Sequence, residues 1–241
     1  MCVVDTPAQL HDLLRTALPN AAVLVAGEEW PVAVVKELVA RAGVVPVIAA
    51  VELTGDRAGL LAELWDAGIS EVVDLRPKPT AERLMAGLRA AHARPLKLRI
   101  EAGLSRRVSM DALTLVRAAA EVVVDGGNSA GLAARVGARE RTLLDWCTRE
   151  SLPAPKRLLM WLRMALGAAL LEQPGRSITS AARGAGYAND HSLRRALAGE
   201  LGADAGAAPR AITVGRVLER FNAELRDLRE AARQKRRGRA A

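Results

Sequence analysis

The sequence predicts an α/β domain followed by an all-α domain, and three observations support this class. Short apolar runs alternate with helical periods up to residue 95, and strand-like runs stop after that point. Half of the 241 residues are hydrophobic, which is enough to build two modest cores. Strands that alternate with helices form a parallel sheet with right-handed crossovers, covered by helices on both faces.

The first domain is expected at residues 1–95, with four strands and four helices. The predicted strands are 2–4, 22–26, 45–51 and 71–75, and the predicted helices are 8–18, 32–42, 58–67 and 80–93. Because a basic stretch follows Pro95, we expect residues 96–110 to be a connector.

The second domain is expected at residues 111–211, where Gly, Pro and Asn separate helical segments. Residues 212–241 should form a C-terminal helix, to about Lys235, and a basic tail. An apolar stripe in this helix returns every seven residues for little more than two heptads, at Val214, Phe221 and Leu228. The stripe therefore either packs on its own domain or pairs with another helix in a coiled coil.

The charge is unevenly distributed along the chain. Residues 1–95 carry 9 Lys or Arg and 12 Asp or Glu, whereas residues 96–241 carry 26 and 15. A basic surface attracts a phosphate backbone, so the second half is expected to bind double-stranded DNA. Cys2 and Cys147 fit no disulfide or metal pattern, and no apolar run is long enough for a membrane span. We expect a cytoplasmic protein that does not bind membranes.

The segment 177–202 has the pattern of a helix-turn-helix. Ile178, Ala181 and Ala182 would form the inner face of a first helix, and Gly186 the turn. Asn189 or Asp190 can cap a second helix, whose Leu193 and Leu197 face inward. A looser copy lies upstream, with a first helix at 129–136, a turn at Gly137 and a second helix at 139–149.

These two units resemble the AraC/XylS family of transcription regulators over about residues 111–211. The resemblance rests on Ser177-Ile178, Ala181-Ala182, Gly186-Tyr187, Ser192-Leu193, Leu201-Gly202 and Pro209, and upstream on Leu132-Ala133, Thr142-Leu143, Arg163 and 168–171. It implies two helix-turn-helix units joined by a long helix, each presenting one reading helix to the major groove.

Transferred by position, the resemblance implies which residues read bases. In the upstream reading helix these are Arg141, Leu144 and Asp145, and in the downstream one His191, Ser192 and Arg195. Phosphate contacts are expected from Arg139, Thr142, Arg149 and Arg194. The chain departs from the family at Leu144 and Asp145, where polar or basic residues are common, and at 197–199, where the family has Phe-Lys-Arg.

Residues 3–93 resemble, in the order of their elements, a two-component receiver domain (a flavodoxin-like fold) that lacks its first strand and helix. Asp74-Leu75-Arg76-Pro77 falls where receivers have a Lys-Pro pair. Ala26-Gly27 occupies the place of the phosphate-accepting aspartate, so we expect no phosphorylation. Glu28, Glu29 and Glu52 lie near strand ends, where acids are usually solvated loop residues.

Together these features predict a DNA-binding transcription regulator and not an enzyme. The sequence contains no phosphate-binding Gly-Lys-Ser/Thr loop and no His or Cys at metal-ligand spacing, so no cofactor or metal is expected. The N-terminal domain would serve self-association, giving a homodimer, or bind a regulatory protein. The alternative is a protein-interaction co-regulator that kept the fold but lost specific DNA binding, which Leu144, Asp145 and Ala198 favour.

Overall fold

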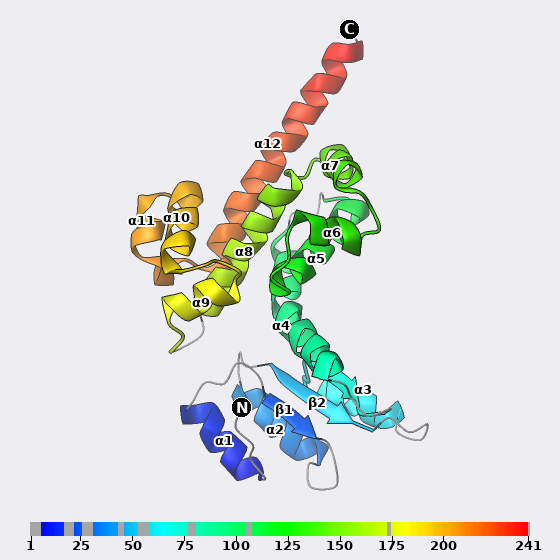
Figure 1. Ribbon diagram of the computed structural model, residues 1–241, viewed down its shortest axis with the longest axis vertical. Coiled ribbons are helices and arrows are strands. Elements are labelled where there is room, and N and C mark those ends of the chain that lie inside the picture. The colour runs from blue at the N-terminus through cyan, green and yellow to red at the C-terminus, as the bar shows by residue number, and fades with distance from the viewer. Residues whose placement is uncertain are drawn as a thin grey trace. The chain divides into compact units, whose positions relative to one another are not determined.

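The computed structural model describes residues 6–16, 22–25, 31–42, 46–52, 58–76, 81–104, 108–172 and 175–240 (Figure 1). The chain divides into two compact units, residues 1–94 and 95–241. The first contains a parallel sheet with helices, and the described part of the second is built from helices. The expected class, α/β followed by α, is therefore confirmed.

A three-stranded parallel sheet forms the centre of the first unit, with the strands in sequence order. The strands are β1 (Ala22–Val25), β2 (Val47–Val51) and β3 (Glu71–Asp74). The helices are α1 (Pro7–Thr16), α2 (Val32–Ala42), α3 (Ala58–Asp66) and α4 (Ala81–Gly103). The strand expected at 2–4 lies outside the described residues.

Successive side chains of β2 point to opposite faces of the sheet, and all five residues of the strand are buried. Val47, Ala49 and Val51 share a core with α1, α2 and α3, whereas Ile48 packs with Val73 of β3 and with α4. Helices therefore cover both faces, which is why β2 reads as a continuous apolar run rather than an alternating one.

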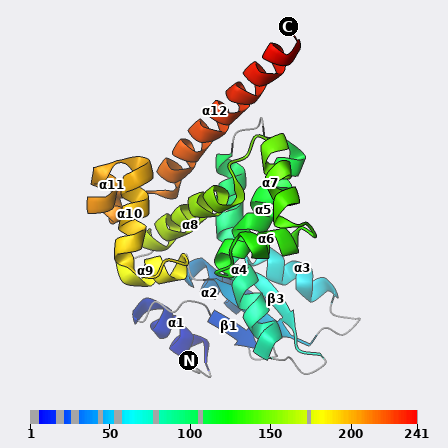
Figure 2. The same ribbon diagram turned by 45° about the horizontal axis from the view of Figure 1, so that its top comes forward.

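The second unit is organised around one long apolar helix, α8 (Pro155–Leu171). The other elements are α5 (Met110–Val124), α6 (Ser129–Arg135), α7 (Glu140–Arg149), α9 (Ile178–Gly184), α10 (Asp190–Leu201), α11 (Ala203–Ala207), the short 3-10 helix η2 (Pro209–Ala211) and α12 (Val214–Ala240). Buried residues lie all round α8, as expected for a helix at the centre of a core. Figure 2 shows α7 and α10 on opposite sides of α8, as does Figure 1.

The expected connector at 96–110 is wrong for its first half, because α4 continues to Gly103. Leu96, Ile100 and Leu104, spaced four apart, are at most 8 % exposed and belong to the core of the second unit. This spacing places them on one helical face, and burial of that face outweighs the loss of one backbone hydrogen bond at Pro95.

Two of the basic residues that suggest a connector form ion pairs within the second unit. Lys97 pairs with Glu121 of α5, and Arg99 pairs with Glu172 after α8. The acids that pair with these two residues are distant in sequence. A local run of basic residues therefore did not indicate a solvated linker here.

The final helix also differs from expectation. It extends to Ala240, so the basic run at 233–239 lies within α12 rather than in a tail after it. Val214, Val217, Leu218, Phe221 and Leu225 are at most 4 % exposed, in the same core as α8. The first part of the apolar stripe thus packs inside its own unit, which favours the first of the two alternatives, while Leu228 stays half-buried.

Candidate nucleic-acid interface

The upstream candidate unit consists of α6, a turn at Gly137 and α7. Asn128 caps α6 by accepting a 3.1 Å hydrogen bond from the amide of Gly131. Gly137 adopts a φ of +67°, a left-handed conformation that costs a residue with a Cβ about 1–2 kcal/mol. Leu143 and Cys147, on the inner face of α7, are at most 1 % exposed. Burial raises the pKa of the Cys147 thiol to about 11, so the thiol is neutral and acts as a core residue.

The downstream unit repeats this construction with α9, a turn at Gly186 and α10. Gly186 has a φ of +78°. Asn189 caps α10, since its Oδ1 accepts a 2.9 Å hydrogen bond from the amide of Ser192. Leu193 and Leu197 are fully buried, as the sequence predicts. The inner face of α9 is also as predicted, with Ala181 and Ala182 fully buried and Ile178 packed against the core.

Both helix-turn-helix units pack on α8. Arg163, in the middle of α8, contacts residues in or next to each of them. Its Nη2 donates a 2.6 Å hydrogen bond to the carbonyl of Gly127, just before α6. Its Nε lies 3.4 Å from the position that a Cβ at Gly186 would take. The hydroxyl of Tyr187 is buried without a hydrogen-bond partner among the described residues. Burial raises the pKa of Tyr187, and the charge of Arg163 opposes this shift.

The outward face of α7 carries a mixed set of side chains. Arg141, Leu144 and Asp145 are exposed, Leu144 by 42 % of its surface, and Arg139 is exposed at the N-cap. Thr142 is half-buried at the side of the helix. Arg139, Arg141 and Asp145 form no hydrogen bond or ion pair within the described part of the chain. This face therefore offers two free cations, one free acid and an apolar side chain.

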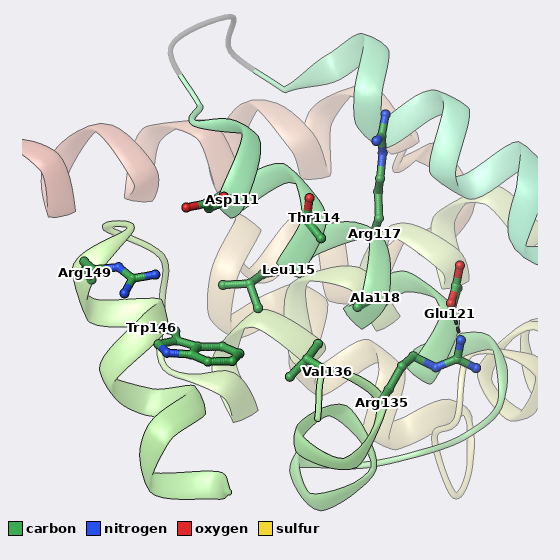
Figure 3. Close-up of a pocket in the computed structure, with 10 residues that line it drawn as sticks. All are labelled: Asp111, Thr114, Leu115, Arg117, Ala118, Glu121, Arg135, Val136, Trp146 and Arg149. Carbon is green, nitrogen blue, oxygen red and sulfur yellow. Dashed lines mark hydrogen bonds and ion pairs between the residues drawn. The ribbon is translucent and has the colours of Figure 1, made fainter. Parts of the chain in front are cut away.

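Arg149 lies at the other end of α7, beside an open groove of about 660 Å³ between α5 and α7 (Figure 3). Its Nε pairs with Glu150 at 3.0 Å, while its side chain stays 61 % exposed. The pKa of Glu150 is lowered by the hydrogen bond from Ser109 and by Arg149. Trp146 and Leu115 form the apolar lining beside it.

Most charges that line this groove are paired within the protein. Arg117 binds Glu101 of α4 at 2.7 Å, and Arg135 at the end of α6 pairs with Glu121 and with Asp125. These pairs join α4, α5 and α6. They therefore stabilise the upstream unit instead of offering free charges to a ligand.

The outward face of α10 is more basic and less crowded. His191 and Arg195, four residues apart, are both exposed and have no hydrogen-bond or ion-pair partner in the described segments. Gly199 follows one turn later, where a Cβ would have no neighbour within 4 Å. Because Gly199 carries no side chain, it leaves space beside Arg195 on this face.

Two of the DNA contacts expected on α10 have partners inside the protein. Arg194 is half-buried and donates 3.2 Å hydrogen bonds to the carbonyls of Gly206 and Ala207 at the end of α11. Ser192 donates from Oγ to Oδ1 of Asn189 at 3.0 Å, as part of the cap. Arg194 was expected to face solvent or DNA, but α11 folds back against α10 and provides carbonyl acceptors for it.

A set of ion pairs that the sequence did not indicate fixes α10 to α8 and α12. Arg157 of α8 binds Glu200 of α10 and Glu224 of α12, with four nitrogen–oxygen distances of 2.7–2.9 Å. Trp161 donates from Nε1 to Glu224 at 2.8 Å. These carboxylates raise the pKa of Arg157. The partners lie 43 and 67 residues away in sequence, so no local pattern could have identified them.

The first unit offers less to a ligand in its described part. Glu52 is exposed after β2, and the Glu28 and Glu29 expected near it lie outside the described residues. Among the residues that the structure describes, no group of three His, Cys, Asp or Glu side chains could hold a metal ion.

None of the described helices combines the length and the apolar character needed to cross a membrane. Comparison of the chain with family models, with curated proteins and with solved structures finds no match in any of the three.

Proposed function

We propose that this chain is a sequence-specific DNA-binding transcription regulator of the AraC type. The observation that carries the proposal is the repeated construction of the second unit. Two short capped helices each lead through a left-handed glycine, Gly137 or Gly186, into a second helix with an exposed outer face. Both pairs pack on α8, and Arg163 contacts each of them. A helix of this kind fits the major groove of B-DNA.

In this proposal α10 is the main reading helix. Arg195 has a free guanidinium, which can donate two hydrogen bonds to O6 and N7 of a guanine. His191 lies one turn nearer to the N-terminus, the end that reaches base edges in such units. Ser192 and Arg194 act differently: Ser192 supports the cap, and Arg194 positions α11 against α10.

The upstream helix α7 would make fewer base contacts. Arg139 and Arg141 supply positive charge for phosphates or a guanine, and Leu144 could contact a thymine methyl group. Asp145 could accept only from a cytosine amino group, since phosphates repel it. Thr142 at the side of α7 and Arg149 at its C-terminal end would position the protein on the phosphate backbone.

A second candidate function follows from the same face. An exposed Leu144 beside Asp145 suits a protein partner better than a polyanion. The chain would then be a co-regulator that binds another protein through α7 and has lost specific DNA binding.

For the first unit we propose a receiver-like domain that is not phosphorylated and serves self-association, as a homodimer, or binding of a regulatory protein. Support comes from three parallel strands in sequence order, with α1 to α3 packed on one face and α4 on the other. The position of the phosphate acceptor is taken by Ala26, whose side chain cannot accept a phosphoryl group.

The test is selection of bound sequences from a random duplex pool with the full chain, followed by affinity measurements. We expect an enriched sequence, and Arg195→Ala should weaken binding to it by about 1–3 kcal/mol while binding to random duplex changes much less. Arg183→Ala, which removes an exposed arginine from α9, is the matched control and should leave the preference intact.

Two results would count against this proposal. If no sequence is enriched at salt concentrations where the chain still binds duplex, specific recognition is absent and the co-regulator function is favoured. If Arg195→Ala weakens binding to all sequences equally, Arg195 only contacts phosphates and does not read a base.

A further inference from the structure

The distal half of α12 is separate from the packed core. From Arg226 to Gly238, none of the side chains that the structure describes is buried. Figures 1 and 2 both show this half extending past the neighbouring helices of its unit. Fifteen residues follow Leu225 up to Ala240, which at 1.5 Å per residue corresponds to an arm of about 22 Å.

The proximal half holds this arm firmly. Phe221 stacks on Trp161 with the ring centroids 5.8 Å apart, and Glu224 accepts hydrogen bonds from Arg157 and Trp161 of α8. On another side of the helix, Asn222 donates a 2.6 Å hydrogen bond to the carbonyl of Gly103. Since Arg157 also binds α10, the arm and the proposed reading helix are fixed to the same point of α8.

The arm is strongly basic. Residues 231–241 contain five Lys or Arg and no acid. Arg226, Arg229, Arg233 and Arg237 are spaced by three, four and four residues, which places them along one side of the helix. Arg233 and Arg237 are exposed and form no hydrogen bond or ion pair with any described residue. A row of arginines along one side of a helix that extends beyond the core suits a polyanionic partner.

The composition of the arm distinguishes between two polyanionic partners, a lipid membrane and duplex DNA. A helix that lies on a membrane needs an apolar face with large side chains, and after Leu228 the only apolar residues of the arm are alanines. A phosphate backbone needs charge alone, because its contacts are electrostatic and independent of sequence. The arm therefore matches duplex DNA better than a lipid surface.

We propose that the arm, residues 226–240 of α12, is a phosphate-binding surface that grips duplex DNA independently of the two reading helices. The proposal rests on the proposed function, since it assigns to the same ligand a further contact. The arm supplies affinity without sequence preference, and it does so as a preformed helix rather than as a tail that becomes ordered on binding.

The experiment measures binding of the full chain to a random-sequence duplex, by fluorescence anisotropy, over a series of salt concentrations. The variant Arg233→Gln/Arg237→Gln removes two charges from the arm, and Lys36→Gln/Arg220→Gln removes two exposed charges elsewhere. Each phosphate contact contributes about 0.9 to the slope of log K against log salt. The arm variant should therefore lower the slope by about 2, and the control should leave it close to that of the unaltered chain.

Equal slopes for the arm variant and the control would overturn the proposal, as would tighter binding of the unaltered chain to phosphatidylserine vesicles than to the duplex. Thermal unfolding of both variants must match that of the unaltered chain, because the substituted side chains are exposed. Because a random duplex contains no preferred sequence, this experiment tests the arm independently of base reading by α7 and α10. An arm effect without an enriched sequence would refute the proposed specific recognition and support the arm.

Discussion

Arg163 of α8 donates a 2.6 Å hydrogen bond to the backbone carbonyl of Gly127, 36 residues earlier in the chain. The same guanidinium lies against the turn at Gly186 of the other helix-turn-helix unit. One side chain thus connects the segment before α6 and the turn at Gly186 to the central helix. We therefore expect this contact, together with the apolar core, to help hold the two helix-turn-helix units on α8.

Replacing Arg163 by Met should destabilise the second unit by about 1–3 kcal/mol, because the Gly127 carbonyl loses a charged donor in a half-buried position. Urea unfolding followed by tryptophan fluorescence measures the change. Arg183→Met, at an exposed arginine of α9, should stay within about 0.5 kcal/mol of the unaltered chain. Similar losses for both variants would show that the contact with Gly127 contributes little.

Arg157 should be the most sensitive charged residue of the helical unit. The substitution Arg157→Met leaves Glu200 and Glu224, each 15 % exposed, facing one another without a cation. We expect a loss of about 1–3 kcal/mol in the free energy of unfolding. Adding Glu224→Gln to Arg157→Met should recover part of the loss, since it removes one of the two unpaired charges. If the two substitutions are simply additive, the residues are not coupled.

Two glycines of the downstream unit should respond in opposite directions to alanine. Gly186→Ala places a Cβ on a residue with a φ of +78°, which should cost about 1–2 kcal/mol. Gly199→Ala adds a Cβ in open space within α10, which should stabilise the helix by about 0.5–1 kcal/mol. Thermal unfolding of the two variants checks both signs. A stabilising Gly186→Ala would show that the turn does not require a left-handed residue.

Cys147 should make stability depend on alkaline pH. Its pKa is raised from 9.0 to about 11 by burial, so the folded state keeps the proton that the unfolded chain loses. The contribution is fully present below pH 9 and is lost as the pH rises through about 11, because the unfolded state then binds fewer protons. Urea unfolding of Cys147→Ala between pH 8 and 11 should show a weaker decline than the unaltered chain. Equal declines would mean that the thiol ionises in the folded state.

Local signals in the sequence located the described strands and most of the helices, but they missed where α4 and α12 end. The alternation of apolar runs and helical periods located β1, β2 and β3 within two residues at each end. Gly137, Gly186 and the cap at Asn189 are signals that act within a few residues, since each concerns the backbone conformation at one point. The inner faces of α9 and α10 followed from helical spacing alone.

Contacts between distant residues were decided by the tertiary structure. The sequence could not show that Arg194 binds the carbonyls of α11, that Arg157 joins Glu200 to Glu224, or that the stripe of α12 packs on α8. A charged side chain has the same local pattern whether it faces solvent or a partner. The sequence by itself therefore determined most of the elements and the sign of their charge. Only the packed structure decided where α4 and α12 end, which arginines stabilise the fold and which stay free, because burial depends on every neighbouring element at once.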